Sequence, residues 1–560
     1  MKKNLLLVFI ITLSFHSCAK AQFSKYIIRF KDKTGTSFSI NNPSQFLSAK
    51  SIQRRLRQNI SIDETDLPVS PAYIDSVRLA GAVIILNKSK WLNQVCIQTT
   101  DNAALAKINN FPFVLSSQPL LRPQSISQPF NKFNEEIETA GLSQPLRASA
   151  DYYDYGSSSS QIHIHEGEFL HNNGFRGEGM LMAIMDAGFF HYQTITAFDS
   201  VRNNNQVAET YDFVNNEISV DEDHIHGMYC FSIIAANWPG QLVGSCPGAK
   251  FYLYRTEDAS TEYPVEEQNW VAAAERADSI GVDVFSTSLG YNTFSNSVFD
   301  HTYSEMDGNT TIISQANDLA AKKGIISVVA AGNDGSATWH FISTPADADS
   351  VVTVGAVNAM GIAAGFSSYG PSSDGQIKPT IASVGAGTAI ANTNNQPQFG
   401  NGTSLATPNI AGLITCLWQA FPDFTNMQII EAVKKSSSIY ANANDRIGYG
   451  IPNFHKAFDD LNQQRALKNA TTILGDEWIK IYPNPFKGNF SILLKPLQSG
   501  TATLKLYDAA GKLYQTKQLS LQTDQPQLIQ FENIQPLATG IYILKFSDGS
   551  NKKSIRILGR

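Results

Sequence analysis

The chain is poor in cysteine, with five in 560 residues. Removal of the N-terminal segment that contains Cys18 would leave Cys96, Cys230, Cys246 and Cys416. Four cysteines in a chain of this size exclude the disulfide framework of small secreted domains. Cys230 and Cys246 are the only pair close together in the sequence, so a single bridge between these two stays open if the chain is exported.

Long hydrophobic runs are also absent. The apolar run at residues 5–13 is too short to cross a bilayer, and no later segment approaches the necessary length. It follows Lys2 and Lys3 and precedes a small-residue site that ends at Ala21, a pattern typical of a signal peptide cleaved after Ala21. Cys18 leaves a lipoprotein alternative, although the residues before it are a poor setting for lipidation.

The most informative segment that is present is residues 401–408, with the sequence Asn-Gly-Thr-Ser-Leu-Ala-Thr-Pro. Glycine allows a tight turn and a close approach of another chain, and proline is tolerated best at the start of a helix. We therefore expect Ser404 at a helix N-terminus marked by Pro408, where the partial positive charge favours a developing oxyanion. Alone, the pattern is equally typical of a serine that caps a helix.

Two further segments carry an acid and a base. Residues 181–188 indicate a short buried strand that ends at Asp186 and turns at Gly188. A carboxylate at the end of a parallel strand lies where open α/β sheets place their sites. His226 precedes an apolar run and is expected at the start of a buried helix, where a histidine suits general base work. Taken singly, each is equally well explained as a capping or packed side chain.

A third segment supplies an amide. Residues 325–330 predict a buried strand, and Asn333 follows it in a turn flanked by glycines. An amide there is ordinary turn chemistry, but it is also what an oxyanion-hole donor requires.

Together these segments resemble the subtilases, the subtilisin-like serine peptidases, over about residues 152–460. The family's triad runs Asp, His, Ser along the chain, which is the order of Asp186, His226 and Ser404. The resemblance implies that Ser404 is the nucleophile, that His226 takes its proton and that Asp186 orients the imidazole. It also implies an oxyanion hole formed by the Asn333 amide and the Ser404 backbone N–H.

The resemblance extends to substrate binding. Residues 284–290 look like the family's strand that pairs with an extended peptide, and Ser343-Thr344-Pro345-Ala346 resembles a segment near the family's primary specificity pocket. We expect the substrate-binding residues to be Ser288, Leu289, Gly290, Ala331 and Gly332. Two departures from the family pattern, Ala187 after the aspartate and Met228 after His-Gly, leave substrate preference in doubt rather than activity.

Acidic and histidine clusters suggest further sites. The subtilase resemblance implies that the acidic run around Glu262 and Glu266 borders the non-primed substrate pockets, where an acidic lip would favour basic substrate side chains. A helix N-terminus enriched in glutamate explains the same residues.

His224 beside residues 221–223 allows a metal site, and His163, His165 and Glu166 alternate like a metal-binding strand, although a surface segment is favoured. We expect no required cofactor and assign no metal ligand. Structural calcium is permitted, but no contiguous calcium loop is recognisable.

The charge is distributed unevenly. The net charge is −6 for the whole chain, +6 for residues 22–120, −20 for 121–470 and +5 for 471–560. A basic module before an acidic domain fits an inhibitory propeptide that docks on its own enzyme, and the acidic bulk argues against nucleic acid as a partner. The alternative to docking is that Arg54, Arg55 and Arg57 form a solvated basic helix face.

Residues 119–150 are rich in Ser, Gln and Pro and are expected to be a linker cut during maturation, between about 118 and 151.

The C-terminal segment predicts a separate β domain. Short alternating strands at residues 491–494, 502–507, 514–519 and 541–546 are separated by turns, which is typical of a small β-sandwich. Tyr482-Pro483-Asn484-Pro485 and the Lys552-Lys553 ending resemble the C-terminal sorting domain of the Bacteroidetes type IX secretion system. An adhesive or carbohydrate-binding sandwich is the alternative, weakened because no aromatic platform is evident.

The predicted architecture is α/β, with a subtilisin-like, mostly parallel sheet flanked by helices, a small α/β propeptide and a C-terminal β-sandwich. The expected segments are a signal peptide (1–21), propeptide (22–118), linker (119–150), catalytic domain (151–460), second linker (461–475) and sorting domain (476–560).

The expected function is that of a serine endopeptidase made as a zymogen. It would be exported through the periplasm and then released or held at the outer-membrane surface. Its partners would be a peptide or protein substrate, its own propeptide and the type IX secretion machinery. A noncatalytic surface adhesin on a subtilase scaffold and an exopeptidase are the alternatives.

Deletion of residues 471–560 is expected to hold the protein in the periplasm, because the segment that directs its export across the outer membrane is lost. Immunoblots of periplasmic, outer-membrane and culture-medium fractions would measure this. Export of the truncated chain at the level of the full chain would contradict the sorting role.

Overall fold

The computed structural model describes residues 24–121, 132–133, 137–138, 151–474, 477–523, 526–532 and 539–560. The signal peptide expected at 1–21, and most of the segment expected to contain the maturation site, lie outside these residues. The chain divides into two compact units, one extending to Ala457 and the other beginning at Phe458.

The first part of the larger unit is a small antiparallel sheet with helices on one face. Its strands lie in the order β2-β3-β1-β4, and the apolar residues of β1 and β3 pack against α2 and α3. The elements are β1 (Lys25–Phe30), α1 (Ala49–Arg57), α2 (Pro71–Arg78), β2 (Ile84–Ser89), β3 (Gln94–Gln98), α3 (Asn102–Asn109) and β4 (Val114–Leu121). This is the small α/β module that the sequence predicts.

The larger part is a nine-stranded sheet in the order β5-β15-β14-β13-β12-β11-β6-β10-β7. The strands from β14 to β7 are parallel, whereas β15 and β5 are antiparallel. Its strands are β5 (Ile137–Glu138), β6 (Leu181–Asp186), β7 (Val207–Asp212), β10 (Lys250–Arg255), β11 (Val284–Thr287), β12 (Ile326–Ala330), β13 (Val352–Asn358), β14 (Ile381–Ala391) and β15 (Pro397–Asn401), with a separate hairpin of β8 (Asn237–Trp238) and β9 (Leu242–Val243).

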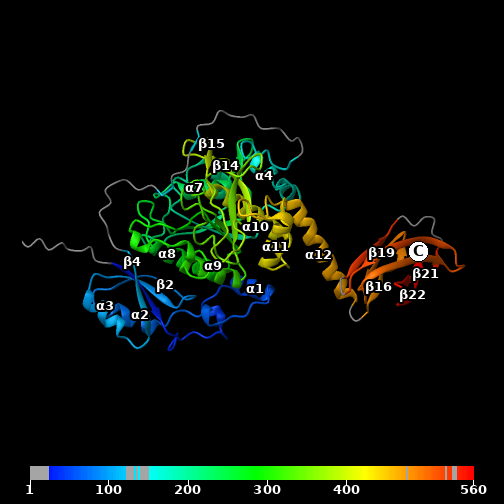
Figure 1. Cartoon of the computed structure of the whole chain (residues 1–560), viewed down its shortest axis with the longest axis horizontal. Helices are drawn as coiled ribbons and strands as arrows, with labels where there is room; N and C mark the ends of the chain where they lie inside the picture. Colours follow the sequence, from blue (N-terminus) through cyan, green and yellow to red (C-terminus); the bar gives the residue numbers. More distant parts are fainter. Residues whose placement is uncertain are drawn as a thin grey trace, which may run out of the picture. The chain divides into compact units, whose positions relative to one another are not determined.

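Helices cover both faces of this sheet (Figure 1). α7 and α10 contact each other and one face, and α8 and α9 contact each other and the opposite face. Because both faces are covered, every residue of β11 and β12 is buried, as continuous apolar strands predict. The helices are α4 (Ser159–His163), α5 (Glu168–Asn172), α6 (Asp199–Asn203), α7 (His226–Ala235), α8 (Val265–Ile280), α9 (Ile312–Lys322), α10 (Thr403–Ala420), α11 (Asn426–Lys435) and α12 (Phe454–Leu474), which runs through the segment expected to be a second linker.

The N-terminal module docks on α8 through buried charge. The carboxylate of Asp278 in α8 accepts hydrogen bonds from the guanidinium groups of Arg54 and Arg55, and Lys90 Nζ lies 3.2 Å from it. Burial alone would raise the pKa of Asp278, but these three cations together hold it well below its usual range. The interpretation of Arg54 and Arg55 as a solvated helix face is therefore wrong, because their side chains are about 1% exposed.

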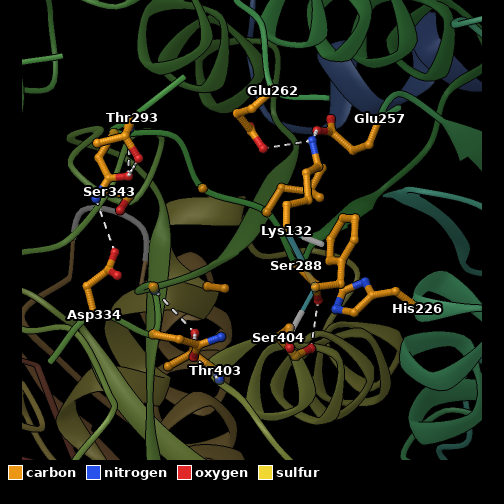
Figure 2. Close-up of a pocket in the computed structure, with 17 residues that line it drawn as sticks. Lys132, His226, Glu257, Glu262, Ser288, Thr293, Asp334, Ser343, Thr403 and Ser404 are labelled. Carbon is orange, nitrogen blue, oxygen red and sulfur yellow. Dashed lines mark hydrogen bonds and ion pairs between the residues drawn. The ribbon is translucent and has the colours of Figure 1, made fainter. Parts of the chain in front are cut away.

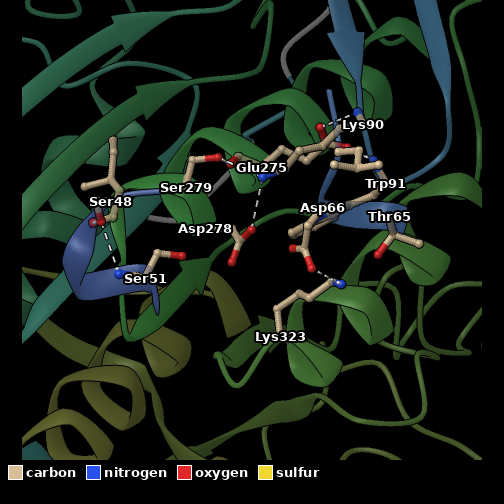
Figure 3. Close-up of polar contacts among 12 residues, drawn as sticks. Ser48, Ser51, Thr65, Asp66, Lys90, Trp91, Glu275, Asp278, Ser279 and Lys323 are labelled. Carbon is tan, nitrogen blue, oxygen red and sulfur yellow. Dashed lines mark hydrogen bonds and ion pairs between the residues drawn. The ribbon is translucent and has the colours of Figure 1, made fainter. Parts of the chain in front are cut away.

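A second buried pair extends the interface. Lys323, at the end of α9, lies 3.0 Å from Asp66 of the N-terminal module, and Asp66 lies 2.6 Å from Arg55. Figure 3 shows Lys90 directed to Asp278 and Lys323 directed to Asp66. The alternation of acid and base across the interface leaves each of these charges with an opposite partner, as buried charges require.

The second unit contains two antiparallel sheets, linked by a parallel contact between β16 and β22. Apolar side chains from both sheets form one core, as the β-sandwich prediction requires. The strands are β16 (Ile479–Lys487), β17 (Asn489–Leu494), β18 (Gly500–Asp508), β19 (Leu513–Leu521), β20 (Gln527–Phe531), β21 (Gly540–Ser547) and β22 (Lys552–Gly559). Across the described part of the chain, no helix has both the length and the apolar character needed to span a bilayer.

Replacement of Arg55 by Ala is expected to loosen the docked module, because it removes a cation buried between Asp66 and Asp278. Breaking a buried ion pair costs about 3–5 kcal/mol, so amide hydrogen exchange in α1 should accelerate by about 10²-fold or more. The measurement uses a full chain that carries Ser404→Ala to prevent proteolysis. Arg78→Ala is the matched control because Arg78 pairs with Asp75 in the same module while both side chains are more than half exposed; equal exchange in the two variants would contradict the argument.

Candidate active site

Asp186 and His226 form a buried hydrogen-bonded pair. Asp186 is the last residue of β6 and His226 is the first residue of α7, and His226 Nδ1 lies 2.6 Å from Asp186 Oδ1. The same carboxylate oxygen accepts the backbone N–H of Ala187 at 2.7 Å. A carboxylate in this position holds the imidazole with its proton on Nδ1, which leaves Nε2 as the basic nitrogen.

Two glycines permit this approach. A Cβ on Gly227 would lie 2.4 Å from the carbonyl oxygen of Gly188 and 2.9 Å from Cβ of Asp186. Gly188 itself has a φ of +139°, and a Cβ there would lie 2.5 Å from the backbone nitrogen of His224. The start of α7 can therefore lie against the end of β6 only because both positions lack side chains.

Ser404 is the second residue of α10, which begins at Thr403. The expectation of Ser404 at a helix N-terminus is therefore met, but Pro408 is not at the helix start: it lies inside the helix. A proline cannot donate to the carbonyl four residues earlier, and here that carbonyl belongs to Ser404. The Ser288 hydroxyl donates to it at 2.7 Å and Cys230 Sγ lies 3.4 Å from it, so Pro408 leaves the Ser404 carbonyl available to residues of other elements.

Asn333 is oriented by the residue that precedes Ser404. Its Oδ1 accepts the backbone N–H of Thr403 at 2.8 Å and the Thr403 hydroxyl at 3.0 Å. Because the oxygen of the amide is engaged, the NH₂ group is the part of Asn333 that can serve the adjoining cavity as a donor. The cavity has a volume of about 240 Å³.

The cavity brings together most of the residues singled out from the sequence (Figure 2). Asp186 lies behind His226 and does not line it, and Ala331 is fully buried while its neighbour Ala330 lines the cavity in its place. The expected residues that do line it are His226, Glu262, Ser288, Leu289, Gly290, Gly332, Asn333, Ser343 and Ser404.

Sequence reasoning missed two residues of the expected linker that lie in this cavity, Lys132 and Phe133. The ring of Phe133 lies 4.3 Å from the ring of His226 and 5.1 Å from that of His224, measured between centroids. Lys132 Nζ lies 2.7 Å from a carboxylate oxygen of Glu257. Nothing in the neighbouring sequence distinguishes this lysine and phenylalanine from other residues of a polar segment, so their place in the cavity could not be predicted.

Among the described residues, the structure contains neither a disulfide between Cys230 and Cys246 nor an exposed His165. Cys230 and Cys246 are not joined by a disulfide: Cys230 faces the Ser404 carbonyl and Cys246 Sγ lies 3.6 Å from the carbonyl of Arg176. His165 is buried and bonded to Ser383 Oγ, so the expected surface segment is wrong for this residue, whereas the side chains of His163 and Glu166 are partly exposed.

The metal interpretations of the histidine clusters gain no support. Around His224 and around His163, the described residues contain no set of three side chains placed to hold a metal ion. The ring of His163 instead contacts Asp151 at 2.8 Å. Glu262, from the acidic run expected to border the substrate pockets, lines the cavity, and both Glu262 and Glu266 are buried.

Replacement of Ser288 by Ala is expected to lower the free energy of unfolding by about 1–3 kcal/mol, because the buried Ser404 carbonyl loses its hydroxyl donor. Adding Pro408→Ala should restore part of this loss by supplying a helical N–H to the same carbonyl, whereas Pro408→Ala alone should bring no gain. Urea unfolding of the four proteins in a Ser404→Ala background measures the coupling. Strictly additive losses would show that the two residues do not share this carbonyl.

Comparison with known proteins identifies three segments. Residues 177–450 match the model of the subtilase family, peptidase S8. Residues 25–135 match the peptidase S8 propeptide domain of Bacteroidota, and residues 480–558 match the secretion system C-terminal sorting domain. The propeptide match continues past residue 118, where we expected the module to end.

Curated relatives agree with the first match. Subtilisin NAT from Bacillus subtilis subsp. natto is 29% identical over 280 residues, which is 49% of this chain and 64% of that protein. Subtilisin E from Bacillus subtilis strain 168 has the same values, so the match covers less than two thirds of these two relatives. Subtilisin from Bacillus pumilus is 28% identical over 51% of this chain and 94% of that protein.

The sorting domain marks the chain for export by type IX secretion, to the medium or to the cell surface. Taken with the sheet topology and the site, the matches show that the chain carries a peptidase S8 domain of the subtilase family, preceded by the propeptide domain of Bacteroidota S8 peptidases and followed by a secretion sorting domain.

Proposed function

We propose that the chain is the zymogen of an exported serine endopeptidase and that Ser404, His226 and Asp186 are its catalytic residues. Ser404 Oγ attacks the carbonyl carbon of the scissile bond while His226 Nε2 takes its proton. The same nitrogen then protonates the departing amine as the C–N bond breaks. Water repeats the sequence on the acyl-enzyme and releases the second product.

The surroundings of Ser404 support this chemistry. The developing oxyanion would accept the Asn333 NH₂ group and the Ser404 backbone N–H, which belongs to the first turn of α10 and is aligned with its dipole. The hydrogen bond between His226 and Asp186 stabilises the imidazolium that forms. The cavity beside these groups provides space for a substrate side chain.

The observation that carries the proposal is the course of the chain's own segment. Phe133 covers the ring of His226, and four residues later Ile137 and Glu138 form β5, which pairs antiparallel with Gly400 and Phe399 of β15. Residues 397–401 lead directly into the turn before Ser404. The propeptide connection therefore enters on the His226 side and leaves along the edge of the sheet, as a substrate would.

This course favours endopeptidase over exopeptidase action. The described residues of this segment occupy two places, Lys132 and Phe133 in the cavity and Ile137 and Glu138 beside β15, so a substrate that follows the same course would extend past Ser404 rather than end at it. An exopeptidase requires a barrier that recognises a free terminus, whereas here β15 offers its edge to the chain beyond Ser404 by strand addition. We propose that maturation cleaves between Phe133 and Ile137. Calcium stays an expectation from the sequence, to which the structure adds no argument.

Replacement of Ser404 by Ala is expected to abolish both propeptide removal and hydrolysis of casein, because the nucleophile is lost. The wild type should mature to a chain that begins between residues 134 and 137, as read by N-terminal sequencing. Ser297→Ala, which changes an exposed serine, should behave as the wild type does. If neither wild type nor Ser404→Ala cleaved casein after the propeptide had been trimmed by another protease, the noncatalytic alternative would be favoured.

A further inference from the structure

The cavity contains a cluster of buried acids that the catalytic steps do not use. Glu257, Glu262 and Glu266 are 0%, 7% and 1% exposed, and one carboxylate oxygen of each lies within 4.8 Å of the others. Their common partner is Lys132, whose Nζ lies 2.7, 3.1 and 2.9 Å from Glu257, Glu262 and Glu266. Figure 2 shows the Lys132 side chain extended toward Glu257 and Glu262.

The peptidase domain itself holds two of these carboxylates in place. Glu266 accepts the backbone N–H groups of Asp258 and Tyr263, both at 2.8 Å. Glu257 accepts the Tyr291 hydroxyl at 2.5 Å and the Thr256 hydroxyl at 2.9 Å. The acids are thus positioned by residues that remain when the propeptide leaves, so the cluster is a preformed site rather than a consequence of Lys132.

The electrostatics of the cluster favour a cation. Burial, together with Glu257 and opposed by Lys132, raises the pKa of Glu262 to about 7, and burial also raises that of Glu266. Burial opposes the charge of Lys132, yet the three glutamates hold its pKa well above the usual range. Departure of Lys132 would leave the three acids without the cation that they share, which is costly unless another cation enters.

The geometry is suited to a primary ammonium group. Three acceptors converge on one nitrogen, which matches the three donors of an ammonium, and Tyr291 lies beside it with its ring 5.9 Å from Nζ. A guanidinium spreads its donors over a plane and fits flat, two-pronged acceptors instead. The site should therefore accept lysine in preference to arginine.

We propose that Glu257, Glu262 and Glu266 form a substrate subsite for lysine and that Lys132 occupies it in the zymogen. The proposal rests on the peptidase function above. Lys132 directly precedes Phe133, which covers His226, so the selected lysine lies on the N-terminal side of the scissile bond, one residue before the side chain that packs on the catalytic histidine. The preferred substrates are thus proteins with a lysine followed by a large apolar residue close before the cleaved bond.

The test uses matured wild-type enzyme in EDTA and decapeptides copied from residues 128–137, with lysine, arginine, norleucine or glutamate at the position of Lys132. We expect kcat/KM for the lysine peptide to exceed that for norleucine by about 10²-fold, a size consistent with charge-assisted hydrogen bonds, with arginine between them and glutamate lowest. Mass spectrometry of the products confirms that all peptides are cut at the same bond.

A variant pair then assigns the effect to the cluster. Among the described residues, the Glu262 carboxylate contacts only Lys132, so Glu262→Gln should reduce the lysine-to-norleucine ratio to about tenfold, whereas Glu217→Gln, which changes an exposed acid, should leave it at the wild-type value. The comparison within the wild type does not depend on the folding of any variant.

The outcomes separate the proposals. Equal cleavage of the lysine and norleucine peptides would overturn the lysine subsite while leaving the peptidase function intact, whereas failure to cleave any peptide or casein would overturn the function itself. A calcium-binding cluster is the other cation-based outcome: if calcium chloride stabilised the matured wild type but not Glu262→Gln, and the peptides were cleaved alike, the acids would be a metal site and the lysine proposal would be wrong.

Discussion

The structure depends above all on the parallel register of β6, β11 and β12. Thr287 pairs with Met185 on one side and with Val329 on the other, so these three strands end level with one another. Asp186, Ser288 and the turn that contains Asn333 follow at this edge, as expected for the carboxyl ends of a parallel sheet. α10 packs on the sheet and brings Ser404 to this edge. One packing arrangement therefore assembles groups that lie more than two hundred residues apart in the sequence.

Small residues and one proline then adjust the contacts at that edge. Gly188 and Gly227 allow the start of α7 to approach Asp186, and Pro408 leaves the Ser404 carbonyl available to Ser288. Neither device acts through the side chains of Asp186, His226 or Ser404. Each determines how closely the backbone elements approach, and so where the hydrogen-bonded pair of His226 and Asp186 lies relative to Ser404.

Opposite charges join the propeptide to the peptidase domain at two places. Arg54, Arg55 and Lys90 meet Asp278 on α8, and Lys132 meets the glutamates of the cavity. In both places the cation belongs to the segment that matches the S8 propeptide domain and the acid to the segment that matches the subtilase model. Under the proposed function, release of the propeptide would leave these acids without their cations, and a lysine of the substrate would replace Lys132.

The sequence alone was sufficient for the local features. The buried strand before Asp186, the helix that begins at His226 and the glycine-rich turn before Ser404 each depend on neighbouring residues, and their order along the chain indicated the family. The net charges of the segments also predicted that the basic module would dock on the acidic one. The tertiary structure alone decided which charges are buried, because Arg55 and Asp278 meet across more than two hundred residues. It likewise decided that Pro408 lies within α10, where Ser288 and Cys230 from other elements contact the carbonyl that the proline leaves without a helical donor. The same holds for Lys132, whose place in the acidic subsite depends on where the chain crosses the sheet edge, and no local pattern encodes that path.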